Sequence, residues 1–457
     1  MNTHAPVIRM LVTALCLLVW ADAPGLGAVR TCDLATAVRT AVRNNPDLEA
    51  GRLEVEQADA RLREAWGYAL PTVDVSGTYT RALKKPVFFL PDFGDLESGR
   101  VIPVEIGSDN SWQMGVTASQ VLFSSAVFTG VSSAGVYTRA AREVYRAGLL
   151  ETVTGVRKAF YGALLAGEAS AAMQEALANA EENLAQARTL SAQGLLSEYD
   201  ELRAEVAAAN LRPEAMAAEN AFAQAVHRLR IAMGVPYSDT LRLAGSLEYV
   251  ARDSIPYREA AEAVEAGNPS LAALRLQIGV QEAIATIERS NYLPTLSAFG
   301  TYTFQAQRND LRVSTRDFVS SAVVGLNLSL NVFSGLRTRA RVEQADLETR
   351  KVRERVRALE TTLQTLVESV LLRLRQAQNR IGAQEMTVEQ ARRGYRIAAA
   401  RFAGGSGTQL EVGDAQLALS RARVNRMEAV FDYLVASADL DQLLGRLPAF
   451  LKGEISD

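Results

Sequence analysis

The feature that most constrains the fold is a pair of alternating segments between Pro294 and Ser334, inside a sequence that is otherwise patterned for helices. In the later segment one face is apolar and the other is small or polar, which is the period of two of a β-strand. Its apolar positions are Val324, Leu326, Leu328, Leu330 and Val332, and the positions between them are Gly325, Asn327, Ser329 and Asn331. The earlier segment alternates likewise, with only Phe299 out of phase between Leu296 and Phe304.

Each alternating segment is about ten residues long, which is the length that a tilted strand needs to cross a bilayer. Taken alone, the pattern fits a soluble amphipathic hairpin as well as it fits a membrane hairpin. The membrane hairpin is favoured because the whole unit occurs twice in the chain.

The repeat is visible as matching motifs at constant displacements. Asn45-Pro46 and Leu70-Pro71-Thr72 return 223 positions later as Asn268-Pro269 and Leu293-Pro294-Thr295, and Gly77 to Thr80 returns as Gly300 to Thr303. Phe123-Ser124 returns after 210 positions as Phe333-Ser334, while Gly194 to Glu205 and Gly234 return after 211 as Gly405 to Gln416 and Gly445. The chain is therefore an internal tandem duplication of one structural unit.

We expect the first repeat over residues 29–250, with a β-hairpin at about 71–123, and the second over 251–457, with a β-hairpin at about 294–333. In the first hairpin, a loop rich in proline, glycine and acid at about 81–111 joins the two strands. Residues 234–255 form a linker between the halves.

Long helices are expected between the hairpins, since apolar residues recur there at alternating steps of three and four. One helix is predicted from near Ser124 to about Gly194, and at ~1.5 Å per residue it approaches 100 Å. A seven-residue apolar repeat makes such helices supercoil with their neighbours. An ordinary helical bundle fits the same periodicity, but it leaves the four strands without a purpose.

The first 28 residues have the order of a secretory signal peptide: Arg9, the apolar run Met10 to Trp20, and the small residues around Ala23. We expect cleavage after about residue 23–28. The mature chain then keeps one cysteine, Cys32, so no internal disulfide forms. Cys32 is a candidate lipid anchor, although Val29-Arg30-Thr31 is a poor match to the small apolar residues that precede such cysteines.

Composition argues against two classes of function. The net charge of −3 shows no basic excess, so we expect no nucleic-acid partner. The mature chain has a single histidine, His227, and a single cysteine, so one chain offers neither a catalytic dyad nor a His/Cys metal site. We therefore expect no enzyme, no catalytic residues, no metal and no cofactor.

Export, strand-type membrane segments and the absence of a long apolar helix together point to a bacterial outer membrane. Four strands cannot close a barrel, and an open edge in lipid leaves backbone groups unpaired. Two copies would give eight strands, whose interior is filled by side chains, and three would give twelve and leave a lumen. Because the inner faces carry Thr, Ser, Asn and Asp74, we expect a homotrimer around a water-filled channel.

Aromatic residues cluster at the ends of the expected strands. Where helix meets strand, an inner interfacial girdle is expected, and at the opposite end an outer one. The inner set is Trp66, Tyr68, Phe123, Tyr292 and Phe333, and the outer set is Tyr79, Trp112, Tyr302 and Phe304. Core packing explains each of these residues individually about as well, but their clustering favours the girdles.

The paired Asn-Pro and Leu-Pro units, the Phe-Ser strand exits and the segment Arg401 to Gln416 resemble the outer-membrane efflux protein family, the TolC-like channels. The resemblance covers essentially the whole mature chain. It implies a mixed α+β membrane protein, in which four transmembrane strands per chain contribute to a trimeric twelve-stranded barrel. The barrel continues into a long α-helical periplasmic tunnel.

The resemblance also implies the function and the partners. The protein would be a passive conduit that exports small molecules, such as drugs and toxic compounds, through the outer membrane. Its partners would be outer-membrane lipid, a periplasmic adaptor (membrane-fusion) protein and an inner-membrane pump of the RND or ABC type, which supplies the energy. The alternatives are the outer-membrane component of a type I protein secretion system and, in a different class, a periplasmic coiled-coil adaptor or scaffold.

At the tunnel tip, the resemblance assigns an acidic ring at the closed entrance to Glu411 and Asp414, with Asp200 at the corresponding place in the first repeat. Glu411 and Asp414 are three apart and so share one helical face. Solvated acids at a helix start, which the helix dipole favours, are the alternative interpretation. The turn glycines at the tip, where the adaptor would dock, are Gly194, Gly404, Gly405 and Gly407. Gly413 departs from the bulkier apolar residue that is usual in the family.

Overall fold

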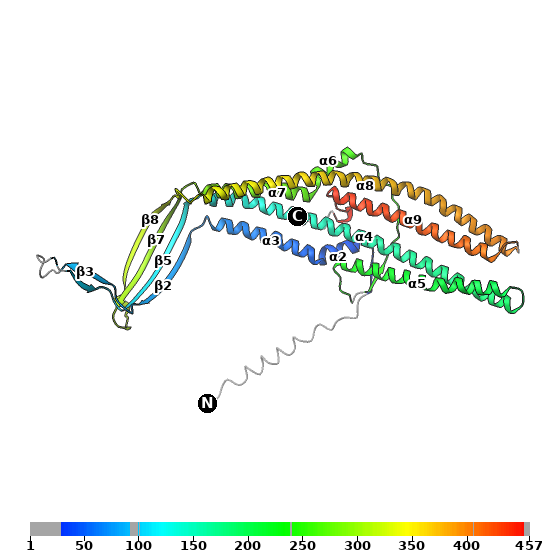
Figure 1. Cartoon of the computed structure of the whole chain (residues 1–457), viewed down its shortest axis with the longest axis horizontal. Coiled ribbons are helices and arrows are strands. Elements are labelled where there is room, and N and C mark those ends of the chain that lie inside the picture. Colours follow the sequence, from blue (N-terminus) through cyan, green and yellow to red (C-terminus); the bar gives the residue numbers. More distant parts are fainter. Residues whose placement is uncertain (1–28, 92–98, 100, 238–239, 405, 452–457) are drawn as a thin grey trace, which may run out of the picture. The chain divides into compact units, whose positions relative to one another are not determined.

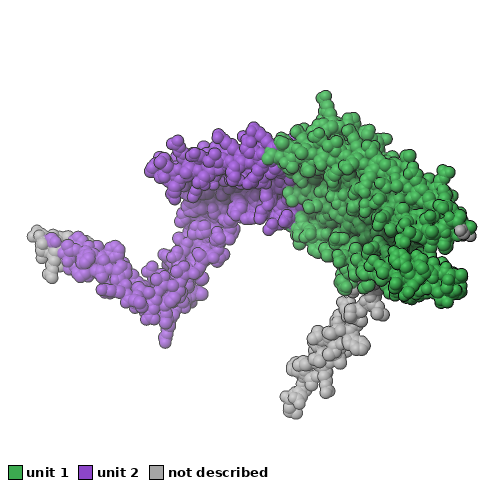
Figure 2. All heavy atoms as spheres, turned by 45° about the vertical axis from the view of Figure 1, so that its right-hand side comes forward, with its two compact units in different colours: residues 1–53, 143–271, 358–457 green, residues 54–142, 272–357 purple. Residues whose placement is uncertain are grey.

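The computed structural model describes residues 29–91, 99, 101–237, 240–404 and 406–451. The expected signal peptide, residues 1–28, lies outside the described residues. The chain forms two compact units, one made of residues 1–53, 143–271 and 358–457 and the other of 54–142 and 272–357 (Figure 2). The units interleave in sequence, because the long helix of each repeat begins in one unit and ends in the other.

The unit that contains residues 54–142 and 272–357 holds a four-stranded antiparallel sheet, with strand order β2-β5-β7-β8 (Figure 1). The strands are β2 (Thr72–Arg81), β5 (Asn110–Phe123), β7 (Thr295–Arg308) and β8 (Val319–Ser329). Each repeat supplies one hairpin, and β5 pairs with β7 where the hairpins meet. At this seam the hydroxyl oxygens of Thr117 and Thr301 lie 3.2 Å apart. The expectation of a mixed helix and strand fold is confirmed.

Strand β8 ends at Ser329, although the alternation of the sequence continues to Val332. Ser329 pairs with Thr295, the first residue of β7, and Pro294 precedes it. Since proline has no N–H to donate to a ladder, the pairing stops there. The sequence pattern therefore placed the end of this strand about three residues too far along.

The segment between β2 and β5 is not a simple loop. It contains a second hairpin of β3 (Val87–Pro91) and β4 (Val101–Glu105), which pair antiparallel. The signal is the short apolar runs within a stretch whose proline and glycine content suggested only a loop. Residues 92–98 and 100, between these strands, lie outside the described residues.

Phe299, the residue out of phase in β7, lies directly opposite Gly325 of β8. A Cβ atom added at Gly325 would come within 2.8 Å of the Phe299 ring. The aromatic ring therefore covers the glycine on the polar face of the sheet, and the missing side chain at Gly325 is what makes room for it.

Each repeat also contains two shorter helices, a long helix and a return helix. In the first repeat these are α2 (Leu34–Asn44), α3 (Pro46–Gly67), α4 (Ser125–Ala192) and α5 (Glu198–Met233). In the second they are α6 (Tyr257–Gly267), α7 (Pro269–Ser290), α8 (Arg337–Ala403) and α9 (Gln409–Leu443). Short 3-10 turns occur at Thr315–Asp317 and Ala449–Leu451. Among the described residues, no helix combines the length and apolar character that a membrane crossing requires.

The Asn-Pro motifs form the same joint twice. The Asn45 side chain donates to the carbonyl of Ala232, near the end of α5, and its oxygen accepts from the backbone N–H of Asp47, at the start of α3. Asn268 likewise donates to the carbonyl of Leu443, at the end of α9, and accepts from Leu271 in α7. Each asparagine therefore ties the start of one helix to the end of another, which satisfies backbone groups that helix termini leave unpaired.

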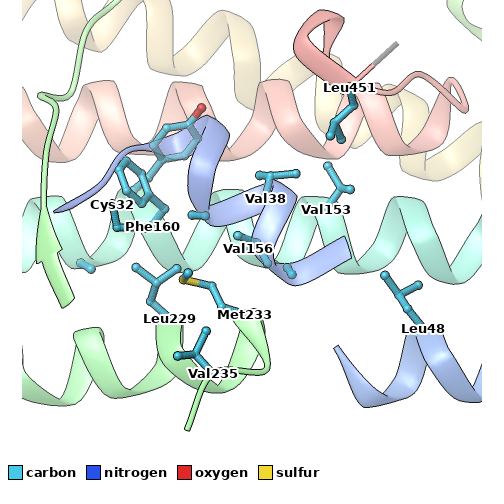
Figure 3. Close-up of a cluster of buried hydrophobic side chains, with 14 of the residues drawn as sticks. Cys32, Val38, Leu48, Val153, Val156, Phe160, Leu229, Met233, Val235 and Leu451 are labelled. Atoms are coloured by element: carbon cyan, nitrogen blue, oxygen red, sulfur yellow. The ribbon is translucent and has the colours of Figure 1, made fainter. Parts of the chain in front are cut away.

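A hydrophobic core packs around the first of these joints (Figure 3). It includes Cys32 and side chains from α2, α4 and α5, among them Val38, Val156, Phe160 and Leu229. Cys32 ends β1 (Val29–Cys32), which pairs in parallel with β6 (Thr240–Leu243) at the start of the expected linker. The linker is therefore attached to the core by a strand pair.

Cys32 is 1% exposed, and this burial, together with the charge of Asp33, raises the pKa of its thiol to about 11. We expect maleimide to leave Cys32 unmodified in the folded protein, because the reagent attacks the thiolate and the sulfur is enclosed. In urea the same cysteine should react fully, as mass spectrometry would show. Rapid modification of the folded protein would contradict the buried position, and failure to react in urea would show that the sulfur carries a lipid.

Candidate functional site

The hairpin tips of the two repeats line an open cavity of about 700 Å³ within the unit that contains residues 143–271 and 358–457. One wall comes from α4 and α5, which run side by side to their connecting turn, and the other from the start of α9 (Figure 1). Much of the first wall is alanine, and polar residues occur on both walls. These polar residues are Asn179, Asn183, Asp200, Arg203, Thr408, Gln409, Asp414, Gln416 and Ser420.

One hydrogen bond crosses between the repeats at this cavity. The Gln409 side-chain nitrogen donates to the Asn183 side-chain oxygen at 2.7 Å. The sequence analysis did not predict this contact. Gln409 lies in the segment that carries the family resemblance, but neither it nor Asn183 indicates the pairing before the two hairpins are brought together. This bond links the turn of the second repeat to the long helix of the first.

The structure separates the three acidic residues expected at the tip. Asp200 and Asp414 both line the cavity, and they come from different repeats. Asp200 lies in the first turn of α5, where its backbone N–H and its carboxylate both bond the Ser197 hydroxyl. Glu411 does not line the cavity, and its carboxylate lies 3.4 Å from the guanidinium of Arg401.

Arg401 organises the turn between α8 and α9. Its side chain donates to the carbonyl of Ser406, while its own carbonyl accepts from the N–H groups of Ser406 and Gly407. Because the same guanidinium pairs with Glu411, the charge of that acid is already balanced. Arg401 opens the segment that carries the family resemblance, but its role in closing the turn follows only from these contacts.

The expected turn glycines differ in what they do. Gly194 has φ of +72°, a left-handed conformation that favours glycine, and a Cβ there would meet open space. Gly407 packs closely, since a Cβ would lie 3.1 Å from the Cβ of Arg401. The N–H of Gly404 continues the helix by donating to Ala400. Gly405 lies outside the described residues.

The sheet presents a second candidate surface, because one of its faces is apolar and exposed. Val73 and Val75 on β2 and Val324, Leu326 and Leu328 on β8 are each at least 66% exposed. In the part of the chain that the structure describes, β2 and β8 each pair with a strand on one side only. The surface is therefore apolar and exposed, and its edge strands carry backbone groups that are open to further pairing.

Aromatic side chains flank this face at both ends. At the end where helices join the strands, all five expected residues are exposed, and they are Trp66, Tyr68, Phe123, Tyr292 and Phe333. At the other end the rings of Tyr79 and Trp112 are 5.3 Å apart, and the Tyr79 hydroxyl donates to Asn110. Tyr302 contacts Phe304, but Tyr302 does not lie at the end of the sheet. Its register partner is Val116, which is four residues further along β5 than Trp112.

Comparison with known proteins agrees with this architecture. The family described as outer membrane efflux protein matches residues 37–235 and 260–446. The chain is 25% identical to Outer membrane protein TolC of Vibrio cholerae over 346 residues, which are 73% of this chain and 76% of that protein.

Solved structures share the fold. The CmeC outer membrane channel of Campylobacter jejuni gives a TM-score of 0.75 at 19% identity, with 90% of this chain and 85% of that chain covered. The outer membrane protein VceC of Vibrio cholerae gives a TM-score of 0.72 at 16% identity, with 90% of this chain and 96% of that chain covered. The MtrE outer membrane channel of Neisseria gonorrhoeae gives 0.71 at 18% identity, with 93% and 94% covered. With a match over most of its length, this chain belongs to the outer membrane efflux protein family, a family of transport proteins of the bacterial outer membrane.

Proposed function

We propose that three copies of this chain form a twelve-stranded barrel and a periplasmic tunnel, through which drugs and other small toxic molecules leave the cell. The observation that carries the proposal is the four-stranded sheet, which has an exposed apolar face and, in the described part of the chain, an edge strand on each side that pairs with one neighbour only. In lipid, every backbone N–H and C=O must be paired within the protein, so the sheet needs other copies to close. Three copies leave a lumen, whereas two fill their interior with side chains.

The polar face of the sheet fits the water-filled side of such a barrel. Along β2 it carries Thr72, Asp74, Ser76 and Thr78, and the register places serine, glutamine and threonine of β5 beside them. The chain itself would be passive. An inner-membrane pump of the RND or ABC type would supply the energy, and a periplasmic adaptor would dock at the hairpin tips around Gly194 and Gly407.

The subunit number can be measured directly. Native mass spectrometry of the channel extracted in detergent from outer membranes should give a mass three times that of the mature chain. The same preparation should form water-filled channels in planar bilayers. A stable monomer or dimer that conducts ions would contradict the proposal.

We also propose that the tip acids form the entrance constriction, with Asp414 and Asp200 as the acting pair. Threefold symmetry would bring several of these carboxylates together, and such a group attracts cations. Glu411 should contribute less, because Arg401 lies 3.4 Å from its carboxylate. The proposal therefore assigns cation attraction to Asp200 and Asp414 and not to Glu411, a distinction that the sequence positions of the three acids do not make.

Block of the reconstituted channel by a trivalent cation, added from the side of the tips, tests this division. Asp414→Asn should weaken block about tenfold, the ratio that ~1.4 kcal/mol of lost attraction gives. Glu411→Gln removes the same formal charge and is the matched control, with an expected change of less than about twofold because its charge is already paired. Equal effects of the two variants would exclude the division.

A further inference from the structure

Three arginines open the long helix of the second repeat. Arg337, Arg339 and Arg341 are the first, third and fifth residues of α8, and all three are exposed. They follow Phe333, one of the aromatic residues at the end of the sheet, by four to eight positions. Three cationic side chains therefore begin eight residues after the last strand of the sheet, and Arg337 and Arg341 share one face of the helix.

The arginines start where the exposed apolar surface stops. Between the end of β8 and the start of α8, the large side chains are exposed, and they are Leu330, Val332, Phe333 and Leu336. Trp66, Tyr68 and Tyr292 are exposed just before the strands β2 and β7 at the same end of the sheet. Aromatic rings of this kind mark the boundary between hydrocarbon and headgroups.

Within the described part of the chain, none of the three arginines forms an ion pair with a carboxylate. Further along the same helix, several basic side chains are paired. Lys351 lies 2.7 Å from Glu348, and Arg353 lies 2.6 Å from Glu282 of α7. The charges of the three arginines next to the apolar surface are therefore not balanced by a carboxylate in the described part of the chain.

Helix stability does not account for these arginines. Cations at the start of a helix oppose its dipole, and α8 has no acidic residue in its first turn. The first repeat shows that the fold does not need them either. The two Phe-Ser motifs are 210 positions apart, and at this spacing the residues of α4 that correspond to the arginines are Val127, Thr129 and Val131, which carry no charge.

We propose that Arg337, Arg339 and Arg341 bind the phosphates of anionic phospholipids in the periplasmic leaflet of the outer membrane. This inference rests on the proposed function, in which the apolar face of the sheet contacts lipid. At ~1.5 Å per residue the rise from Arg337 to Arg341 is about 6 Å, which fits the ~5–8 Å of headgroups on each side of the hydrocarbon. Guanidinium groups suit phosphate because they donate two parallel hydrogen bonds.

A tryptophan-quenching experiment tests the inference in the intact channel. In a Trp112→Phe variant, Trp66 is the remaining tryptophan outside the expected signal peptide, and it lies at the end of the sheet where the helices begin. The channel is reconstituted in nanodiscs that contain either brominated phosphatidylglycerol or brominated phosphatidylcholine at the same mole fraction. We expect phosphatidylglycerol to quench Trp66 at a lower mole fraction than phosphatidylcholine does.

The triple variant Arg337→Gln, Arg339→Gln, Arg341→Gln should lose this preference. The quantity to compare is the ratio of the phosphatidylcholine midpoint of quenching to the phosphatidylglycerol midpoint. This ratio should fall at least about fivefold, which is the factor that one cation contributes at a charged membrane. The matched control is Arg350→Gln, Arg375→Gln, Arg393→Gln, three exposed arginines further along α8. These begin ~20 Å beyond Arg337, more than the ~8–10 Å over which salt screens charge, so the control should keep the preference. Equal behaviour of the two triple variants would overturn the inference.

Two other results separate this inference from the proposed function. If both lipids quench Trp66 equally in the channel that keeps all three arginines, this end of the sheet does contact lipid, but the inference about the arginines fails. If neither brominated lipid quenches Trp66, this end of the sheet does not contact lipid, and the proposed function fails as well. Quenching of the triple variant by phosphatidylcholine shows that the variant has folded and inserted.

Discussion

Leu326→Arg should prevent the channel from assembling in the outer membrane, whereas Asn327→Arg, one residue later, should be tolerated. Leu326 is 67% exposed on the apolar face of β8, together with Val324 and Leu328. Asn327 lies on the opposite face, where its register partner is Ser297. An arginine facing lipid near the bilayer centre costs ~2–4 kcal/mol. Three copies multiply this to ~6–12 kcal/mol, which is comparable to the whole stability of a folded domain.

The measurement is the amount of trimer recovered from outer membranes on gels run without heating. We expect no trimer of Leu326→Arg and near-normal amounts of Asn327→Arg, because the second arginine would face water in the lumen. The two variants introduce the same charged side chain at neighbouring positions, and Asn327→Arg is the larger increase in volume, so general destabilisation affects both. Comparable recovery of both variants would show that the apolar face of the sheet does not contact lipid.

Much of the fold follows from patterns that a sequence carries directly. Period-two alternation identifies β7 and β8, and steps of three and four identify α4 and α8, because side chains alternate between the two faces of a strand and return to one face of a helix every three or four residues. The β3–β4 hairpin was missed because its two strands are five residues each and are embedded among prolines and glycines. The end of β8 was misplaced because it depends on Pro294, the residue before the neighbouring strand β7, and alternation within β8 cannot report it.

The candidate site was less accessible to sequence analysis. The family resemblance placed Glu411, Asp414 and Asp200 at the tip, but it could not distinguish them. That distinction needs two tertiary facts, the pairing of Glu411 with Arg401 and the common cavity of Asp200 and Asp414. The bond between Gln409 and Asn183 joins residues 226 positions apart, and nothing in the sequence around either residue indicates the other. Contacts between helices of different repeats are set by packing, and packing leaves no local signature.

Comparison of the two repeats explains why both have a glycine at the corresponding positions 234 and 445. Both glycines follow a return helix, have positive φ of 64° and 68°, and press against the backbone of the Asn-Pro joint. A Cβ at Gly234 would lie 2.4 Å from the carbonyl oxygen of Asn44, and one at Gly445 would lie 2.1 Å from that of Gly267. Backbone atoms cannot move aside as the end of a flexible side chain can, so the two helices would have to separate.

We therefore expect Gly234→Ala and Gly445→Ala each to destabilise the protein strongly. The left-handed backbone costs an alanine ~1–2 kcal/mol, and forced overpacking adds ~1–3 kcal/mol. Gly194→Ala is the matched control, since φ is +72° there but a Cβ meets no atom within 4 Å, so only the first of these costs applies. Urea unfolding of the detergent-solubilised channel, followed by circular dichroism, should place the midpoints of Gly234→Ala and Gly445→Ala well below that of Gly194→Ala. If all three midpoints coincide, conformational preference alone explains the glycines, and the duplicated joint is not the close backbone contact described above.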